Sequence, residues 1–185
     1  NLERDVEIKV LRPDFAKDRD YKARFRREAK AAAKLNHANI VQIYEVGEDG
    51  GKHYIAQELI LGKNLREHLE ESGALSPEQA CEVLLGVASA LAAASRQGIT
   101  HRDIKPENVM WARSGEIKVA DFGLARLGDD ADSSRADLPQ AGFTLGTPRY
   151  MSPEQVQGRT VDPRSDLYSL GVMMYHLIAG RPPFK

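Results

Sequence analysis

The segment His101-Arg-Asp-Ile-Lys-Pro-Glu-Asn108 carries side chains that suit the transfer of a phosphate group to a hydroxyl. Within it, Asp103 can accept a proton from a hydroxyl, and Lys105 can steady a phosphoryl oxygen. Asn108 and Asp121, thirteen residues further on, provide oxygen atoms of the kind that Mg²⁺ takes alongside phosphate oxygens. A short hairpin between Asn108 and Asp121 would return both ligands to the same edge of the site.

The elements that must position these groups begin with a β-rich part. Residues 6–11 alternate apolar and polar side chains, which predicts a half-buried strand. Residues 18–35 are strong helix formers with one apolar stripe at helical spacing, made of Phe25, Ala29, Ala32 and Ala33. Residues 40–46 and 53–60 favour strands and flank Glu48-Asp-Gly-Gly51, which predicts a hairpin.

The second part of the chain is mainly helical. Ser76-Pro-Glu-Gln79 combines an N-cap, a first-turn proline and a capping-box glutamine, and the helix that it opens is expected to stop at Gly98. Short strands are expected at 109–111 and 117–120, and a last apolar helix at 164–179. The sequence therefore predicts an α+β fold in two lobes, and a cleft between two such lobes is a common place for a ligand.

The catalytic segment, followed by Asp121-Phe-Gly123, resembles the catalytic loop and the metal-binding D-F-G of protein kinases. The match runs over eight consecutive residues with D-F-G at the family's distance, and Lys105-Pro-Glu-Asn108 is similar to the Ser/Thr branch. The resemblance implies that Asp103, Lys105 and Asn108 are catalytic. It implies ATP as phosphoryl donor, with Mg²⁺ (or Mn²⁺) held by Asn108 and Asp121, and structural roles for His101, Phe122 and Gly123.

The nucleotide-binding residues of the family also have counterparts here. Val6-Glu-Ile-Lys9 resembles the family's V-A-I-K strand, so Lys9 would hold the α- and β-phosphates, with Glu28 as its partner. Taken alone, either residue would be read as a surface charge. Glu7 departs from the pattern, because the family usually has Ala there, against the adenine ring.

Further positions fall along the expected hinge between the lobes. The backbone at Glu58 and Ile60 would bind the adenine edge, and Gln57 would be the gatekeeper. The resemblance further places Asn64 at the ribose and Met110 at the floor of the adenine site, although a core methionine is the alternative for Met110.

Gly146-Thr-Pro-Arg-Tyr-Met-Ser-Pro-Glu154 resembles the end of the kinase activation segment, with Ser in place of the family's Ala. Thr147 would shape the acceptor site, while Glu154 and Asp166 would be structural. Arg102 would pair with a phosphate on the activation segment. Thr144 is the best candidate to carry that phosphate; Ser133 and Ser134 are weaker candidates, and an unmodified polar loop is the alternative.

Composition agrees with a soluble enzyme domain. The 185 residues carry a net charge of −1, which gives no support to nucleic acid or an anionic membrane as main partner. No stretch is long and apolar enough to span a membrane, so a cytoplasmic domain is expected, with an anchor beyond residue 185 left open. The single cysteine, Cys81, excludes an internal disulfide and is expected to be a small buried hydrophobe.

The resemblance implies a two-lobed kinase fold cut at both ends. Residues 1–60 would form a partial N-lobe without its glycine-rich loop, residues 61–64 the hinge, and residues 65–185 a C-lobe without its last helices. The expected activity is transfer of the ATP γ-phosphoryl group to Ser or Thr of proteins, with autophosphorylation of the activation segment. A pseudokinase scaffold, or an inactive kinase fragment, is the alternative. No motif of P-loop NTPases or of common hydrolases is present.

Overall fold

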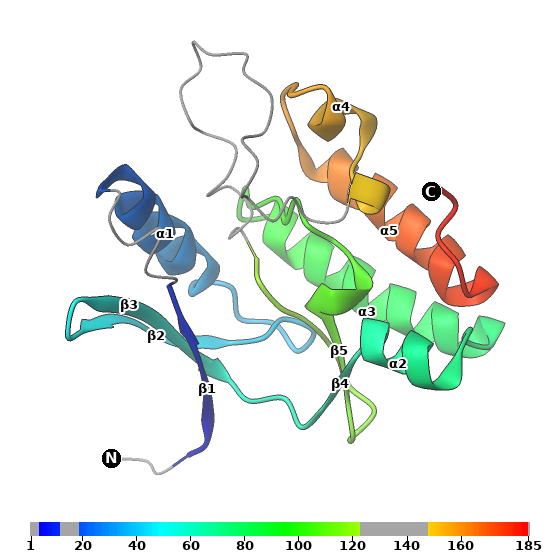
Figure 1. Ribbon diagram of the computed structural model, residues 1–185, viewed down its shortest axis with the longest axis horizontal. Coiled ribbons are helices and arrows are strands. Elements are labelled where there is room, and N and C mark those ends of the chain that lie inside the picture. Colours follow the sequence, from blue (N-terminus) through cyan, green and yellow to red (C-terminus); the bar gives the residue numbers. More distant parts are fainter. Residues whose placement is uncertain (1–3, 12–18, 123–147, 185) are drawn as a thin grey trace.

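The computed structural model describes residues 4–11, 19–122 and 148–184. A three-stranded antiparallel sheet with one helix forms one lobe, and a second, smaller sheet with the remaining helices forms the other (Figure 1). The predicted α+β organisation is confirmed. No helix in these described ranges is both long and apolar enough to cross a membrane.

The first sheet has the order β1-β3-β2, with β1 at Val6–Val10, β2 at Ile43–Asp49 and β3 at Lys52–Glu58. The predicted hairpin joins β2 to β3 through Gly50 and Gly51. Both glycines have positive φ, 52° and 74°, as a two-residue turn between twisted strands requires.

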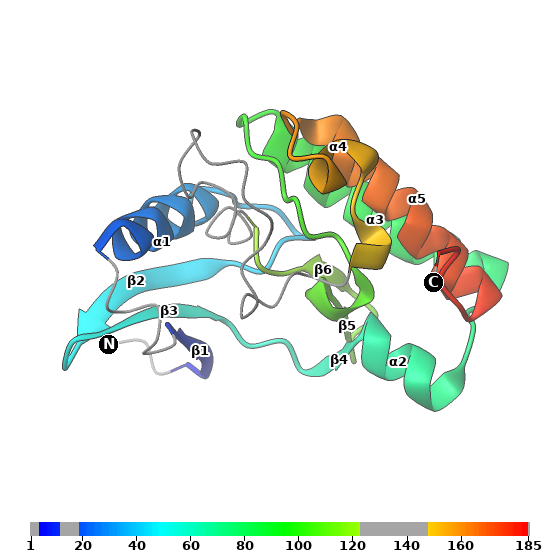
Figure 2. The same cartoon turned by 45° about the horizontal axis from the view of Figure 1, so that its top comes forward.

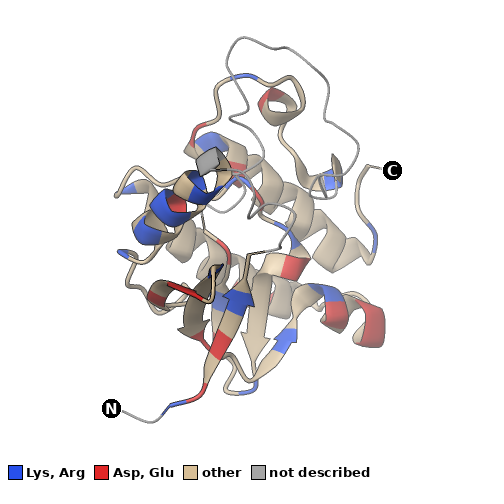
Figure 3. Cartoon of the chain, turned by 60° about the vertical axis from the view of Figure 1, so that its left-hand side comes forward, with Lys and Arg blue, Asp and Glu red and all other residues tan. Residues whose placement is uncertain are grey.

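Helix α1 spans Arg19–Ala32 and packs against this sheet (Figure 1). The predicted apolar stripe explains the packing, because Phe25 and Ala29 join Leu11 and Ile55 in a small core. The opposite side of α1 is basic and faces solvent, with Arg26, Arg27 and Lys30 exposed (Figure 3).

The predicted hinge residues include a strand. Gly62–Asn64 form β4, which pairs with β5 (Val109–Ala112), and β5 pairs with β6 (Ile117–Val119). Gly62 is required there, because a Cβ atom would lie 2.2 Å from the carbonyl oxygen of Trp111. Figure 2 shows this small sheet between the first sheet and the helices of the second lobe.

Four helices build the second lobe: α2 (Leu65–Ser72), α3 (Pro77–Ser95), α4 (Pro153–Val156) and α5 (Pro163–Ala179). The capping box predicted at Ser76 and Gln79 is present. Helices α3 and α5 share the main core, whose fully buried side chains include Val83, Val87, Met173 and Leu177.

Two backbone and side-chain connections join the lobes. Val41 N–H donates to the Val119 carbonyl (2.9 Å), and Val119 N–H donates to the Asn39 carbonyl (2.8 Å), so the segment before β2 runs beside β6. Lys118 on β6 pairs with Glu58 at the end of β3, with Nζ 2.8 Å from Oε1 and 3.0 Å from Oε2. The Glu58 carboxylate also accepts from the Gln42 N–H (3.2 Å).

Cys81 differs from its prediction. It is exposed on the outer face of α3, beside Glu82 and Leu85, which are also exposed. The apolar character of this stretch comes from the alanine, valine and leucine side chains of the inner face, and Cys81 falls on the other side of the helix.

Candidate active site

The catalytic segment gathers three of the predicted residues around one carboxylate. Lys105 Nζ lies 2.6 Å from Asp103 Oδ2, and Asn108 Nδ2 lies 2.9 Å from the same oxygen. The Asn108 amide also donates to the Asp103 carbonyl (2.7 Å), which fixes its orientation. The Asp103 carboxylate is about one-third exposed, so an incoming hydroxyl can reach it.

Asp166 holds this segment from below. Its buried carboxylate accepts the backbone N–H groups of His101 and Arg102, both at 2.7 Å. Burial raises the pKa of Asp166, while the His101 charge and the two N–H donors act in the opposite direction. Arg102 has a φ of 72°, and its carbonyl accepts from the Gln155 side chain (2.7 Å), so contacts on both sides stabilise this turn.

His101 connects the catalytic segment to Phe122. The histidine is fully buried, and its ring lies edge-on to the Phe122 ring with centroids 4.6 Å apart. Its Nδ1 accepts the Asp103 N–H (3.2 Å), so Nε2 carries the proton and donates to the Ala120 carbonyl (2.8 Å). One histidine therefore ties the position of Asp103 to the strand that delivers Asp121.

Asp121 lies directly after β6 and pairs with Lys9 across the cleft, with Lys9 Nζ 2.6 Å from Oδ1. Its φ of 64° is in the left-handed region, which is uncommon outside glycine. In the part of the chain that the structure describes, the only other non-glycine residue with positive φ is Arg102. Both unusual backbone positions thus border the same site.

Glu28 does not pair with Lys9 as predicted. Its Oε1 accepts from Arg27, with Nε at 3.1 Å and Nη2 at 3.0 Å, and the carboxylate is nearly buried. Two local cations and one distant carboxylate explain the difference: Arg27 is adjacent in sequence to Glu28, while Lys9 finds Asp121 at shorter range. Lys9 remains at the cleft, but its partner in this arrangement is Asp121.

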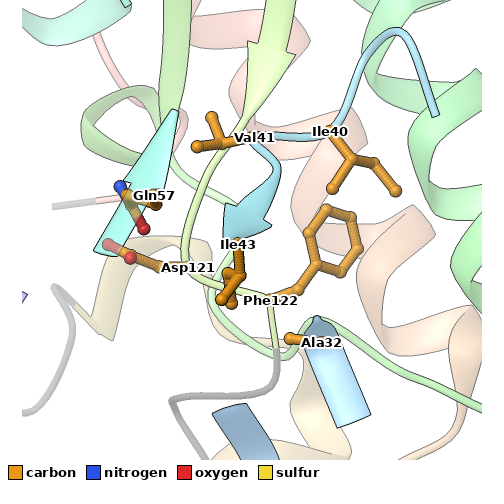
Figure 4. A pocket seen from close by; sticks show the side chains of 7 residues that line it. All are labelled: Ala32, Ile40, Val41, Ile43, Gln57, Asp121 and Phe122. Carbon is orange, nitrogen blue, oxygen red and sulfur yellow. The ribbon is translucent and has the colours of Figure 1, made fainter. Parts of the chain in front are cut away.

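A small cavity lies behind these residues. Its volume is about 10 Å³, and the lining includes Gln57, Asp121 and Phe122 together with apolar residues from α1 and the segment before β2 (Figure 4). This volume is at the lower limit for one water molecule, so the space between α1 and the catalytic segment is closed to a ligand.

The residues predicted around the adenine lie along one line from β3 to β5. Glu58 donates its N–H to the Gln42 carbonyl (2.8 Å), which leaves its own carbonyl for a ligand. Within the described residues, the Ile60 N–H has no protein acceptor. Met110 is half-buried in β5, opposite Asn64 in register.

Asn64 has a local role that differs from its prediction. Its side-chain oxygen accepts the Glu67 N–H (2.9 Å), and Glu67 accepts the Asn64 N–H in return, so Asn64 is the N-cap of α2. The oxygen predicted to meet a ribose is therefore already used by the helix.

The far end of the predicted activation segment is anchored to α5. Ser165 donates from its hydroxyl to Glu154, which lowers the pKa of that carboxylate, and Ser169 donates to the Tyr150 carbonyl (2.7 Å). Tyr150 lies 2.6 Å from His176 Nδ1. The remaining predicted residues of this region, Gly123, Thr144 and Thr147, lie outside the described residues.

Burial moves the pKa values of the Tyr150–His176 pair apart. It raises the pKa of Tyr150 to about 12, helped by the negative charge of Glu107. It lowers the pKa of His176, and the positive charge of Arg66 acts in the same direction. The phenol therefore donates and the neutral imidazole accepts at physiological pH.

The donor set fits Mg²⁺ bound together with phosphate. Within the described ranges, no three His, Cys, Asp or Glu side chains cluster as a complete metal site. Asp121 offers a carboxylate, and the Asn108 amide nitrogen already donates to Asp103, so its oxygen is the atom left for a metal. Mg²⁺ usually takes one or two protein ligands and completes its shell with phosphate oxygens and water.

Three interactions at the site had no counterpart in the sequence prediction: the Lys118–Glu58 pair, the Gln155–Arg102 bond and a hydrogen bond from Gln57 Nε2 to Glu7 Oε2 (3.0 Å). Each joins residues far apart in the chain, and only the last had a local signal. A charged Glu7 two residues before Lys9 faces the same side of β1 as Lys9.

Comparison with known proteins follows the same lines. The protein kinase domain model matches residues 2–185. The chain is 47% identical over 187 residues to a probable serine/threonine-protein kinase of Streptomyces coelicolor, covering 99% of this chain and 27% of that protein. It is 44% identical over 183 residues to the serine/threonine-protein kinase PknL of Mycobacterium tuberculosis, covering 99% of this chain and 45% of that protein.

Among solved structures, the kinase domain of PknI from Mycobacterium tuberculosis superposes with a TM-score of 0.75 at 32% identity, over 97% of this chain and 65% of that chain. The chain thus spans less than half the length of these two curated relatives and about two-thirds of a solved kinase domain. On the match to the family model and the identity to these relatives, this chain belongs to the protein kinase family.

Proposed function

We propose that this domain transfers the γ-phosphoryl group of ATP to serine or threonine hydroxyls of other proteins. The observation that carries the proposal is the convergence of Asp103, Lys105, Asn108, Asp121 and Lys9 on one side of the cleft. Two carboxylates, two ammonium groups and an amide oxygen are a set that phosphoryl transfer can use in full.

Asp103 orients the acceptor hydroxyl and takes its proton. The hydroxyl oxygen forms the new bond to the γ-phosphorus, the bond from that phosphorus to the bridging oxygen breaks, and ADP keeps the bonding electrons. Lys105, now paired with Asp103, stabilises the oxygens of the transferring group. Asn108 and Asp121 would hold Mg²⁺, which neutralises negative charge on the phosphates.

Lys9 has to change partner when the nucleotide binds. In the present arrangement it neutralises Asp121, while Glu28 is held by Arg27. We propose that phosphate oxygens draw Lys9 away from Asp121, and that Glu28 then pairs with Lys9. The present arrangement is accordingly the nucleotide-free state of the site.

The same chemistry would act on the domain itself. We propose Thr144 as the site of autophosphorylation, because it lies ahead of the segment that α5 anchors, and Arg102 as the group that receives its phosphate. Protein substrates and ATP are the expected partners. We also propose that the domain acts in the cytoplasm, where ATP is available.

The test is a phosphorylation assay with Mg-ATP, read by intact mass and phosphopeptide mapping. Asp103→Asn should reduce transfer by about 10²–10⁴-fold, because the general base is lost while both hydrogen-bonding atoms remain. The matched control is Asp49→Asn at the exposed end of β2, which should leave transfer unchanged.

Phosphate on Thr144 that depends on Asp103 would support the proposal in full. Binding of Mg-ATP without any transfer, to itself or to a general protein substrate, would instead identify a pseudokinase scaffold.

A further inference from the structure

The cleft-facing side of β1 carries an acidic residue beside Lys9. Side chains alternate along a strand, so Glu7 and Lys9 lie on the same face with Cα atoms about 7 Å apart. Lys9 reaches Asp121, which shows that this face looks into the cleft. In the sheet register Glu7 is directly opposite Gln57, and Lys9 is opposite Ile55.

The Glu7 carboxylate is held in place by one neutral donor. Gln57 is 3% exposed, and its Nε2 donates to Glu7 Oε2 at 3.0 Å. Among the described residues no cation lies within ion-pair distance of Glu7, because Lys9 is taken by Asp121. The pair therefore presents a negative carboxylate and the Gln57 carbonyl oxygen, which are both acceptors.

This acceptor pair lies where the base of the nucleotide would go. The inference rests on the proposed function, in which Lys9 and Asp121 bind phosphates and the backbone at Glu58 and Ile60 meets the base. Gln57 immediately precedes Glu58, and Glu7 is two residues from Lys9 toward that end of the sheet. The edge of the base that turns toward β3 would meet Glu7 and Gln57.

We infer that the Glu7–Gln57 pair makes the site select purines with an amino group at position 6 over purines with an oxo group. A 6-amino group has a second N–H beyond the one used by the Glu58 carbonyl, and it can donate that hydrogen to the Glu7 carboxylate. A 6-oxo group would face the same carboxylate with a lone pair. Buried polar groups left unpaired or facing a like charge are costly, so the two bases are separated.

A purely structural role for the pair is the competing explanation. Cross-strand polar pairs stabilise sheets by small amounts and need no ligand. In that case replacing Glu7 would change the stability of the fold, and it would weaken the binding of every nucleotide by the same factor. The ratio of two affinities separates the explanations.

The experiment measures the affinities of Mg-ATP and Mg-ITP by calorimetry for the wild type, Glu7→Gln and Gln57→Leu. ITP carries an oxo group at position 6 in place of the amino group, so it probes that edge without adding other substituents. A glutamine at position 7 can offer its carbonyl to adenine or its amide to the oxo group. We expect the preference for ATP over ITP to fall about tenfold in Glu7→Gln.

Gln57→Leu should lower the same preference by a smaller factor, because the carboxylate remains but loses the donor that orients it. Glu45→Gln is the matched control, since Glu45 is an exposed carboxylate on the neighbouring strand β2. Its ratio should equal that of the wild type.

Two results would overturn the inference, and they differ. If the wild type binds ATP and Glu7→Gln keeps the same ATP-to-ITP ratio, base selection by Glu7 is refuted while the proposed function stands. If the folded wild type binds neither nucleotide, the proposed function fails and the inference fails with it.

Discussion

The Lys118–Glu58 ion pair gives a sharp test of how the lobes are joined. Lys118 Nζ contacts both carboxylate oxygens of Glu58, at 2.8 and 3.0 Å, and the two side chains are only 12% and 25% exposed. Replacing Lys118 by Met keeps the length of the side chain but leaves the Glu58 carboxylate partly buried with only the Gln42 N–H as donor.

The expected loss of stability lies between two known limits. Exposed pairs contribute about 0–1 kcal/mol, and removing one partner of a fully buried pair costs about 3–5 kcal/mol. For the intermediate burial of this pair we expect a loss of about 2 kcal/mol, which corresponds to about 4–8 °C in Tm for a chain of this size.

The assay is urea unfolding followed by circular dichroism, with Lys63→Met as the control. Lys63 pairs with Glu71, and both side chains are more than half exposed, so its replacement should cost less than about 1 kcal/mol. A double-mutant cycle with Glu58→Gln isolates the coupling between the two side chains. If Lys118→Met costs no more than the control, or if the coupling is absent, the pair does not connect the lobes energetically.

Three further predictions concern single positions. Ser76→Ala should destabilise the protein by about 1 kcal/mol in urea unfolding, because the Gln79 N–H at the start of α3 loses its acceptor. Gly62→Ala should cost about 1–3 kcal/mol through the clash with the Trp111 carbonyl, and unchanged stability would disprove the close approach. Stability should fall as the pH drops from about 7 toward 5, because the pKa of His176 is lowered by folding and the unfolded chain takes up the proton first. This slope should be shallower in His176→Gln, and equal slopes would refute it.

Most of the fold could be predicted from local patterns. The start of α3 follows from Ser76 and Gln79, and the β2–β3 turn follows from Gly50 and Gly51, because in both cases the determining contacts lie within a few residues. The strand β4 was missed because its partner β5 follows much later in the chain and no short-range pattern announces the pairing.

The candidate site divides in the same way. The residues that the structure brings together around Asp103 are close in sequence, and their spacing predicted that they would meet. The partners of Lys9 and Glu28 depend on which opposite charge is nearest in three dimensions, which sequence cannot rank. For Asn64, a local capping signal competed with the family resemblance, and the local signal explains the contact observed.

The two lysine–carboxylate pairs in the cleft have a consequence for the order in which the site is loaded. Lys9 compensates Asp121 and Lys105 compensates Asp103, so a metal ion arriving alone meets carboxylates whose charge is already balanced. An ion that comes with a polyphosphate brings the anions that can release both lysines at once. Metal and nucleotide should then enter as one complex, and the empty site should resist occupation by stray divalent cations.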